Sequence, residues 1–319
     1  MRIIRGIDGL PGDTRLAVTV GVFDGVHLGH QQVFRVLEQT SRRLGAMPVV
    51  ITFDPHPEAV VAGRAPDLLM DQQERLEWIS RLVAGLVVLQ RFDEVFRRTS
   101  AEEFMLRIGA DRNLVALVMT HVTGFGRDRG GTLPVLRRIG HGRWETVEAP
   151  TLDMRGARVS SARIRELVAS GRLASASRLL GRPYALVGDV VHGERRGREL
   201  GFPTANLHFA DPVCLPPDGI YAARATWGGE AVLSPSEHAQ AVISLGTQPT
   251  FGGRVRLLEV HLLDRDVDLY GQRLRVELCR RLRGQKRYDS ADELIEQMGR
   301  DVERARAVLA SDTMRDRPA

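Results

Sequence analysis

Two histidines near the start of the chain have the type and spacing expected of a phosphate-binding site. Residues 21–30 read Gly-Val-Phe-Asp-Gly-Val-His-Leu-Gly-His, so Gly29 stands between His27 and His30. This stretch follows an apolar run and opens a predicted helix, and a helix N-terminus favours anions. Imidazole donors there would suit attack by one phosphate on the α-phosphorus of a nucleoside triphosphate, which needs positioning and charge stabilisation rather than a protein nucleophile. The alternatives are that both histidines only cap the helix, or that they bind a metal without a third ligand nearby in sequence.

Two further segments would complete such a site. Residues 52–57, Thr-Phe-Asp-Pro-His-Pro, follow a second predicted strand and should lie at its carboxyl end. Residues 159–165, Val-Ser-Ser-Ala-Arg-Ile-Arg, open a predicted helix with two hydroxyls and two guanidiniums. Serines at a helix start are usually caps, whereas Arg165 is placed one turn further in to reach a β- or γ-phosphate.

A glycine-rich stretch in the second half carries a separate set of candidate ligands. Residues 188–206 contain several arginines and end in Gly-Phe-Pro-Thr-Ala-Asn. A glycine-rich arch can hold phosphates through backbone N–H groups. Thr204 and Asn206 offer hard oxygen ligands two residues apart, which suits Mg²⁺ shared with nucleotide phosphates. Any single glycine here fits an ordinary hairpin, but the whole stretch indicates nucleotide binding.

Glu259 is a candidate general base. It lies in the run Leu-Glu-Val-His-Leu-Leu, which alternates poorly and is expected to be largely buried. A lone carboxylate in that setting suits proton abstraction from an alcohol. The alternative is a solvated strand residue.

The elements that must position these groups differ between the two halves of the chain. From residue 14 to about 120, predicted strands alternate with predicted helices, which favours a doubly wound parallel sheet. The predicted strands are 16–22, 48–53, 86–90 and 114–119, and spacings typical of capping boxes stand at 71–74 and 100–103.

After two short predicted helices, 162–170 and 173–180, the pattern changes at Pro183. The β-patterned runs are 184–191, 219–227, 241–245, 255–263 and 273–282. Short runs broken by Gly and Pro predict a small antiparallel barrel or sandwich, and a capping box at 290–293 predicts a terminal helix. We therefore expect an α/β protein with domains at 1–182 and 183–319.

Composition excludes several chemistries. Lys286 is the only lysine among 45 basic residues and follows Gln285, so the chain has no P-loop lysine after glycine. A lysine Schiff base would depend on this one residue. Cys214 and Cys279 are the only cysteines, so a disulfide framework and a zinc ribbon are excluded. Phosphates must be held by arginine, histidine, backbone N–H groups and a metal.

Charge and hydropathy also limit which partners and which cellular location are expected. The net charge of +5 comes from scattered residues in this 319-residue chain, so we expect no nucleic-acid partner. No apolar run approaches the ~18 residues of a membrane span, and the N-terminus lacks the apolar core of a signal peptide. We expect a cytoplasmic protein without a membrane partner.

Taken together, these segments resemble the bacterial bifunctional riboflavin kinase/FAD synthetase family from residue 18 to about residue 306. G-x-F-D-G-x-H-x-G-H, F-D-P-H-P and S-S-x-x-I-R look like its nucleotidyltransferase half. G-R-x-L-G-F-P-T-A-N-L looks like its kinase half, as do residues 216–221, 246–251 and 269–271. G-F-P-T-A-N is close to diagnostic, whereas H-x-G-H alone is shared with other nucleotidyltransferases.

The resemblance implies that the C-terminal half moves the γ-phosphate of ATP onto the 5′-hydroxyl of riboflavin. Glu259 would be the base, and Thr204 and Asn206 would bind Mg²⁺. The phosphate contacts implied in this half are Gly193, Gly197 and Arg198.

For the N-terminal half, the resemblance implies transfer of AMP from ATP onto FMN with release of pyrophosphate. His27, His30 and Arg165 would stabilise the triphosphate. The other implied ATP contacts are Gly21, Phe23, Asp24, Gly29, Ser160 and Ser161; the implied flavin contacts are Asp54, His56, Pro57 and Phe125. The expected partners are riboflavin, FMN and ATP, and the expected state is a monomer or weak homo-oligomer.

The chain departs from the family pattern at three positions. Val122 stands where Asp or Asn is usual, Ala162 where the serine motif has Thr, and Ser244 where the kinase half has Asn. Two alternatives therefore stay open at this point. One is a riboflavin kinase with an impaired or redirected nucleotidyltransferase half, and the other is a non-enzymatic flavin- or nucleotide-binding regulator.

Overall fold

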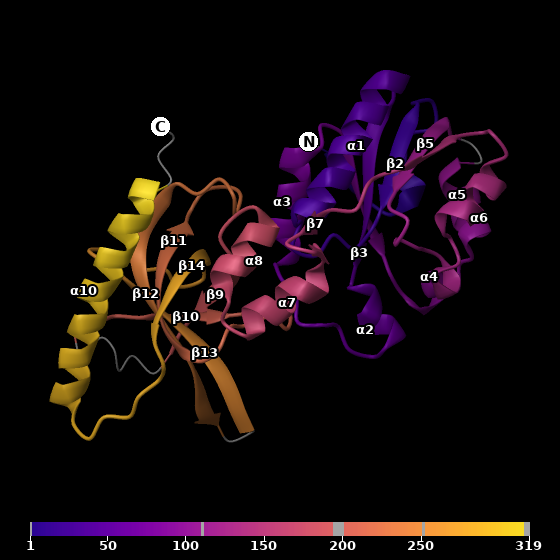
Figure 1. Cartoon of the computed structure of the whole chain (residues 1–319). Coiled ribbons are helices and arrows are strands. Elements are labelled where there is room, and N and C mark those ends of the chain that lie inside the picture. The colour runs from indigo at the N-terminus through magenta and orange to yellow at the C-terminus, as the bar shows by residue number, and fades with distance from the viewer. Residues whose placement is uncertain (1, 110–111, 194–200, 251–252, 316–319) are drawn as a thin grey trace. The chain divides into compact units, whose positions relative to one another are not determined.

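The computed structural model describes residues 2–109, 112–193, 201–250 and 253–315, and the chain divides into two compact units (Figure 1). The first unit comprises Met1–Leu68 and Arg75–Ser161, and the second comprises Leu69–Glu74 and Ala162–Ala319. The second unit thus includes the two helices before residue 182. The division of the two activities at 182/183 remains a prediction.

A six-stranded parallel sheet forms the centre of the first unit, in the order β1-β4-β3-β2-β5-β6. The strands are β1 Arg2–Arg5, β2 Leu16–Val20, β3 Met47–Asp54, β4 Leu86–Arg91, β5 Leu114–Met119 and β6 Glu145–Glu148. From β2 the chain adds β3 and β4 on one side, and from β5 it adds β6 on the other side, so the direction of strand addition reverses between β2 and β5. In open α/β sheets, ligands bind at the carboxyl ends of the strands where this reversal occurs. The predicted doubly wound sheet is confirmed.

Helices cover both faces of this sheet, as its buried strands require. The helices are α1 Leu28–Leu44, α2 Pro57–Val61, α3 Gln72–Leu82, α4 Glu94–Arg97, α5 Ala101–Gly109 and α6 Leu133–Gly140. One apolar cluster joins β2, β3, β4 and β5 to α5 and α6. Helix α1 contacts β2, β3 and β5, and all five residues of β2 are buried. The sheet therefore holds the turn after β2 on a rigid base.

Local sequence signals account for several helix ends. Gly45 ends α1 in the left-handed conformation, with φ at 58°. At the start of α5, the Ser100 N–H donates to Glu103 Oε2 at 2.7 Å and the Glu103 N–H donates to Ser100 Oγ at 3.1 Å. The hydrogen bond from the Ser100 backbone lowers the pKa of the Glu103 carboxyl. This reciprocal pair confirms the predicted capping box.

The other predicted capping box, at residues 71–74, forms only in part. Asp71 Oδ1 accepts the Glu74 N–H at 3.0 Å, but the buried Glu74 carboxylate accepts a hydrogen bond from Arg275 Nε at 2.9 Å. The edge strands β1 and β6 were not predicted because each has only four residues and carries charged residues at both ends, Arg-Ile-Ile-Arg and Glu-Thr-Val-Glu.

Six antiparallel strands close into a barrel in the second unit, in the order β10-β13-β12-β11-β14-β9. The strands are β9 Ala185–Val191, β10 Ala205–His208, β11 Gly219–Trp227, β12 Glu237–Thr250, β13 Gly253–Leu262 and β14 Arg273–Arg283. The predicted barrel is confirmed, although β10 was not predicted as a strand. Helices α7 Ser161–Ala169 and α8 Leu173–Leu180 precede it.

The terminal helix α10, Ala291–Arg315, packs along β11, β12 and β14 (Figure 1). Its buried Ala305 and Leu309 meet Ile220 and Leu282 of the barrel. Asp301 is 4% exposed and accepts hydrogen bonds from Arg283 Nε at 3.0 and 2.9 Å and from Nη2 at 2.7 Å. A charged bond of this kind holds the helix only while both partners are present.

We therefore expect Asp301→Ala to lower the free energy of unfolding by about 3 kcal/mol, because it leaves the Arg283 charge without its carboxylate. Chemical denaturation of the purified protein measures this change. The matched control is Glu303→Ala on the same helix, whose carboxylate is 79% exposed and should matter by less than about 0.5 kcal/mol. Equal losses in the two variants would contradict this role for Asp301.

Candidate active sites

A tight turn carries the chain from β2 into α1 and holds the first candidate site. Phe23, Gly25 and Val26 have left-handed backbone, with φ at 55°, 81° and 37°. Both non-glycine side chains are buried. Positive φ is a strained conformation for a β-branched residue, and such strain concentrates at functional sites. The turn lies at the carboxyl end of β2, where the strand order reverses.

His27 and His30 lie together at the N-terminus of α1. Their rings stack with centroids 3.6 Å apart and planes 18° from parallel. His27 is 4% exposed, and its Nδ1 accepts the His30 N–H at 3.2 Å. With Nδ1 accepting, a neutral His27 carries its proton on Nε2 and is a donor there. His27 therefore does cap α1. The cap uses only Nδ1, so Nε2 can still donate to a phosphate.

The glycine between these histidines makes the stacking possible. A Cβ at Gly29 would lie 3.1 Å from both Cε1 and Nδ1 of His27, and 3.4 Å from the Val159 carbonyl oxygen. The Phe23 ring meets His30 edge-on at 5.3 Å. A Cβ at Gly21 would lie 2.8 Å from Phe23 Cζ. The predicted residues of this motif thus form one packed group.

Side chains from three other segments bond to the backbone of the turn. Ser161 Oγ donates to the Asp24 carbonyl oxygen at 2.8 Å, and Thr52 Oγ1 donates to that of Val22 at 3.0 Å. Arg75 Nη1 also donates to Val22 at 3.2 Å. Ser160 directly precedes α7, and Arg165 follows Ser161 by one turn of that helix. The phosphate contact of Arg165 remains a prediction.

The predicted flavin-binding residues lie in different environments, some at the ends of β3 and α2 and one in the apolar core. Asp54 ends β3, and His56 caps α2 by accepting the Glu58 N–H on Nδ1 at 3.2 Å, with Pro57 in the first turn. Phe125 is buried in the core cluster, with its ring 5.0 Å from that of Phe104. Its ring therefore contributes to packing, and its contact with a flavin remains a prediction.

The segment after β5 reaches the same edge of the sheet. Thr120 and Thr123 share a hydrogen bond between their hydroxyls at 2.7 Å. Val122, between them, is 39% exposed and so places an apolar side chain where a polar one is usual in the resembled family. Two hydroxyls therefore flank this substitution.

The second candidate site lies on three neighbouring strands of the barrel. Glu259 of β13 pairs directly with Asn206 of β10 and with Ser244 of β12. Directly opposite residues project from the same face of a sheet, so these three side chains form one row. Leu258 and Val260 are each 1% exposed, whereas Glu259 is half-buried. The run 258–263 is largely buried, as expected, but β13 alternates and Glu259 takes its outer face.

Gly193 is packed against this row. A Cβ there would lie 2.0 Å from Asn206 Nδ2, so any side chain at position 193 would have to displace the carboxamide. The ring of the neighbouring His192 lies against that of Tyr270, with centroids 3.8 Å apart and planes tilted by 32°. Thr204 directly precedes β10. Gly197 and Arg198 lie outside the described residues.

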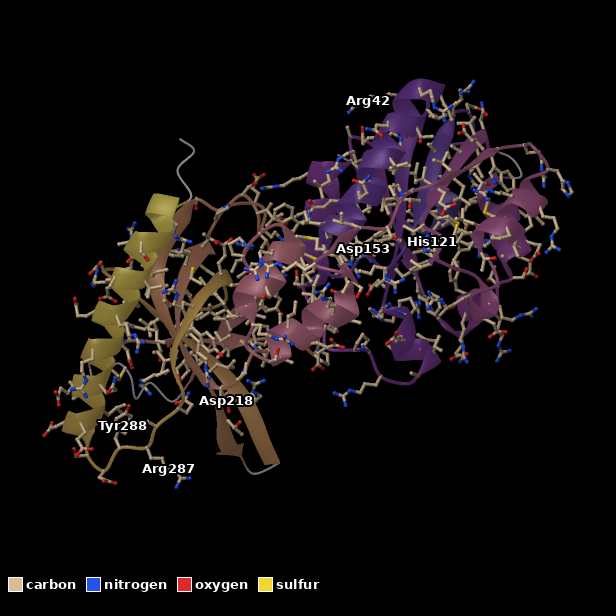
Figure 2. All side chains as sticks on the ribbon, viewed as in Figure 1. Arg42, His121, Asp153, Asp218, Arg287 and Tyr288 are labelled. Atoms are coloured by element: carbon tan, nitrogen blue, oxygen red, sulfur yellow. The ribbon has the colours of Figure 1, made fainter. Side chains whose placement is uncertain are left out.

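Gln285 bonds to Ser244 of this row, and Asp218 bonds to other residues of β12 and β13; neither residue was predicted. Gln285 Nε2 donates to Ser244 Oγ at 3.2 Å and to the Leu245 carbonyl oxygen at 3.0 Å. Asp218 (Figure 2) accepts hydrogen bonds from Thr247 Oγ1 at 3.0 Å and Arg256 Nε at 2.9 Å. The signal for Asp218 was present, because it lies in the 216–221 segment that resembles the kinase half.

The part of the chain that the structure describes contains no group of three or more His, Cys, Asp or Glu residues able to hold a metal ion. Among the described residues, no helix has the length and apolar character needed to span a bilayer.

Comparison with known proteins agrees with this division into two sites. The family model for FAD synthetase matches residues 11–163, and the model for riboflavin kinase matches residues 180–309. Bifunctional riboflavin kinase/FMN adenylyltransferases are similar: that of Escherichia coli K12 is 35% identical over 96% of this chain and 97% of its own, and that of Haemophilus influenzae is 34% identical over 98% and 100%. A crystal structure described as a macrolide-efflux protein from Streptococcus pneumoniae superposes with a TM-score of 0.82 at 30% identity, covering 96% and 99% of the two chains.

A doubly wound sheet with a histidine pair at its switch point, joined to a barrel with a carboxylate–carboxamide row, defines a two-part ATP-using transferase. The chain belongs to the bifunctional riboflavin kinase/FMN adenylyltransferase family. It phosphorylates riboflavin to FMN and adenylylates FMN to FAD, with riboflavin, FMN and ATP as substrates. Kinases and adenylyltransferases that use ATP need a divalent metal ion.

The contact between Gly193 and Asn206 yields a direct test of the kinase site. Gly193→Ala should lower the rate of FMN formation at least about tenfold, because the new methyl group must displace the Asn206 carboxamide. Gly299→Ala is the matched control, since a Cβ at that helix position has no neighbour within 4 Å. Steady-state assays of riboflavin phosphorylation compare the two variants. Full activity in Gly193→Ala would show that Asn206 is not needed in its present position.

Proposed function

We propose that Glu259 is the general base of the riboflavin kinase half. The observation that carries this assignment is the cross-strand row Asn206–Glu259–Ser244 on the outer face of the barrel. Glu259 would take the proton of the riboflavin 5′-hydroxyl. The 5′-oxygen of riboflavin would attack the γ-phosphorus of ATP, and ADP would leave. A half-buried carboxylate is accessible to a substrate hydroxyl, as this role requires.

Thr204 and Asn206 fit Mg²⁺ in this half. Both supply neutral oxygen donors, and the described residues around them offer no cluster of acidic ligands that would bind a metal alone. A site of this kind needs nucleotide phosphates to complete the ligand set, which is how Mg²⁺ usually binds in phosphoryl-transfer enzymes. When bound, the ion would neutralise charge on the β- and γ-phosphates. Gly193, Gly197 and Arg198 are proposed to contact the same phosphates.

In the adenylyltransferase half, we infer that His27 and His30 stabilise the triphosphate of ATP. The FMN phosphate oxygen attacks the α-phosphorus and pyrophosphate leaves, so no protein base is required. The stacked rings at the α1 N-terminus support this assignment, since two donors and the helix end lie together. Arg165 is proposed to contact the same phosphates.

The remaining assignments rest on position in the sequence motifs. We propose ATP contacts at Gly21, Phe23, Asp24, Gly29, Ser160 and Ser161, and flavin contacts at Asp54, His56, Pro57 and Phe125. We also propose that residues 1–182 carry adenylylation and residues 183–319 carry the kinase. The protein would act in the cytoplasm as a monomer or weak homo-oligomer without nucleic acid.

Replacing the base should separate the two reactions. We expect Glu259→Gln to lower FMN formation by about 100-fold or more, because the amide keeps the size of the side chain but cannot accept a proton. Adenylylation of supplied FMN should continue at the wild-type rate. The control Glu237→Gln changes an exposed carboxylate at the start of β12 and should alter neither rate. Loss of both reactions in Glu259→Gln would refute the division of labour.

The reverse separation is expected at the histidine pair. His27→Ala should lower adenylylation of FMN by about 100-fold, because one preorganised donor to the triphosphate is lost. Phosphorylation of riboflavin should be unchanged in the same preparation, which shows that the second unit is folded, and a wild-type circular dichroism spectrum shows the same for the first unit. His141→Ala, at an exposed position after α6, is the control. Wild-type FAD formation by His27→Ala would exclude the proposed role.

A further inference from the structure

A buried arginine lies behind the adenylyltransferase site. Arg75 is in the first turns of α3, and it is only 5% exposed. Removing a guanidinium from water is costly unless its N–H groups are hydrogen-bonded. The partners of Arg75 therefore indicate what the residue is retained for.

The guanidinium joins the backbone of two neighbouring strands where each strand ends. Its Nη1 donates to the Val22 carbonyl oxygen at 3.2 Å, just after β2, and its Nη2 donates to that of Phe53 at 2.9 Å, near the end of β3. The backbone bond from the Gly21 N–H to the Ile51 carbonyl oxygen, at 3.0 Å, joins the two strands immediately before this point. Arg75 thus continues the connection from β2 to β3 beyond the regular pairing.

The two segments held in this way are those with the predicted substrate contacts. Val22 leads into the turn that carries His27 and His30, and Phe53 leads into Asp54 and His56. We propose that Arg75 is a positioning residue for FMN adenylylation, which sets the distance between the phosphate-binding turn and the segment after β3. This proposal rests on the proposed assignment of those two segments.

The shape of the side chain matters for this role as much as its charge. A guanidinium is a rigid planar fork whose two Nη atoms can reach two carbonyl oxygens at once. A lysine offers one flexible ammonium group and would leave at least one of these separated carbonyls with a poorer bond. Thr52 Oγ1 bonds to Val22 as well, so removal of Arg75 weakens this connection without abolishing it.

The test compares Arg75→Met with a matched arginine elsewhere in the same unit. Arg112 also donates to backbone carbonyls, those of Leu10 at 3.3 Å and Asp8 at 3.2 Å. It lies just before β5, however, at the amino end of that strand, whereas the candidate site lies at the carboxyl ends. Arg75→Met should lower kcat/KM for FMN adenylylation by about 100-fold and raise the KM for ATP. Arg112→Met should lower thermal stability yet keep both kinetic constants within about twofold of wild type. Riboflavin phosphorylation in each preparation reports the folded fraction of the second unit.

The outcomes separate positioning from a general loss of stability. Wild-type adenylylation by Arg75→Met would overturn the proposal, as would an equal kinetic loss in Arg112→Met. If Arg75→Met does not fold, Arg75→Lys decides: a raised KM for ATP in a protein with wild-type circular dichroism supports positioning, and unchanged kinetics overturn it. Failure of the wild-type protein to make FAD would instead refute the assigned activity of this half.

Discussion

The turn from β2 into α1 is the constraint on which the adenylyltransferase half depends. Two non-glycine residues in it, Phe23 and Val26, hold left-handed backbone conformations that an isolated chain would avoid. They persist because the surrounding structure fixes the turn from several sides. Thr52, Arg75 and Ser161, from three different segments, each donate a hydrogen bond to its carbonyl oxygens. Strain at the site is thus balanced by bonds from the rest of the unit.

The barrel positions its reactive groups in another way. Antiparallel pairing of β13 with both β10 and β12 places Asn206, Glu259 and Ser244 side by side without any strained turn. A one-residue slip in either pairing would move Glu259 out of the row. Closure of the barrel opposes such a slip, and α10 packs on β12, one of the three strands of the row. The first half depends on a turn, and the second depends on a register.

Much of this architecture could be predicted from the sequence because the signals are local. The capping box at Ser100 and the glycine that ends α1 are formed by residues within one or two turns. The sheet edge that carries His27 follows from strand–helix alternation. The edge strands and β10 could not be predicted, since each has only four residues and acquires its conformation from its neighbours.

The candidate sites show the same limit. The motif residues His27, His30, Gly193 and Asn206 are indicated by their spacing, and the structure brings each pair together. Arg75 could not be identified, because one arginine among many is marked only by its burial and its distant partners. The alternation of β13 around Glu259 was missed because Leu262 and Leu263 end its run with two consecutive apolar residues.

The central claim is that one chain carries both reactions in sequence. Incubation of the purified protein with riboflavin, ATP and Mg²⁺, followed by chromatographic separation of the flavins over time, tests it most directly. The account predicts that FMN accumulates first and is then converted to FAD. The absence of any phosphorylated flavin, or FMN that is never converted, would contradict it.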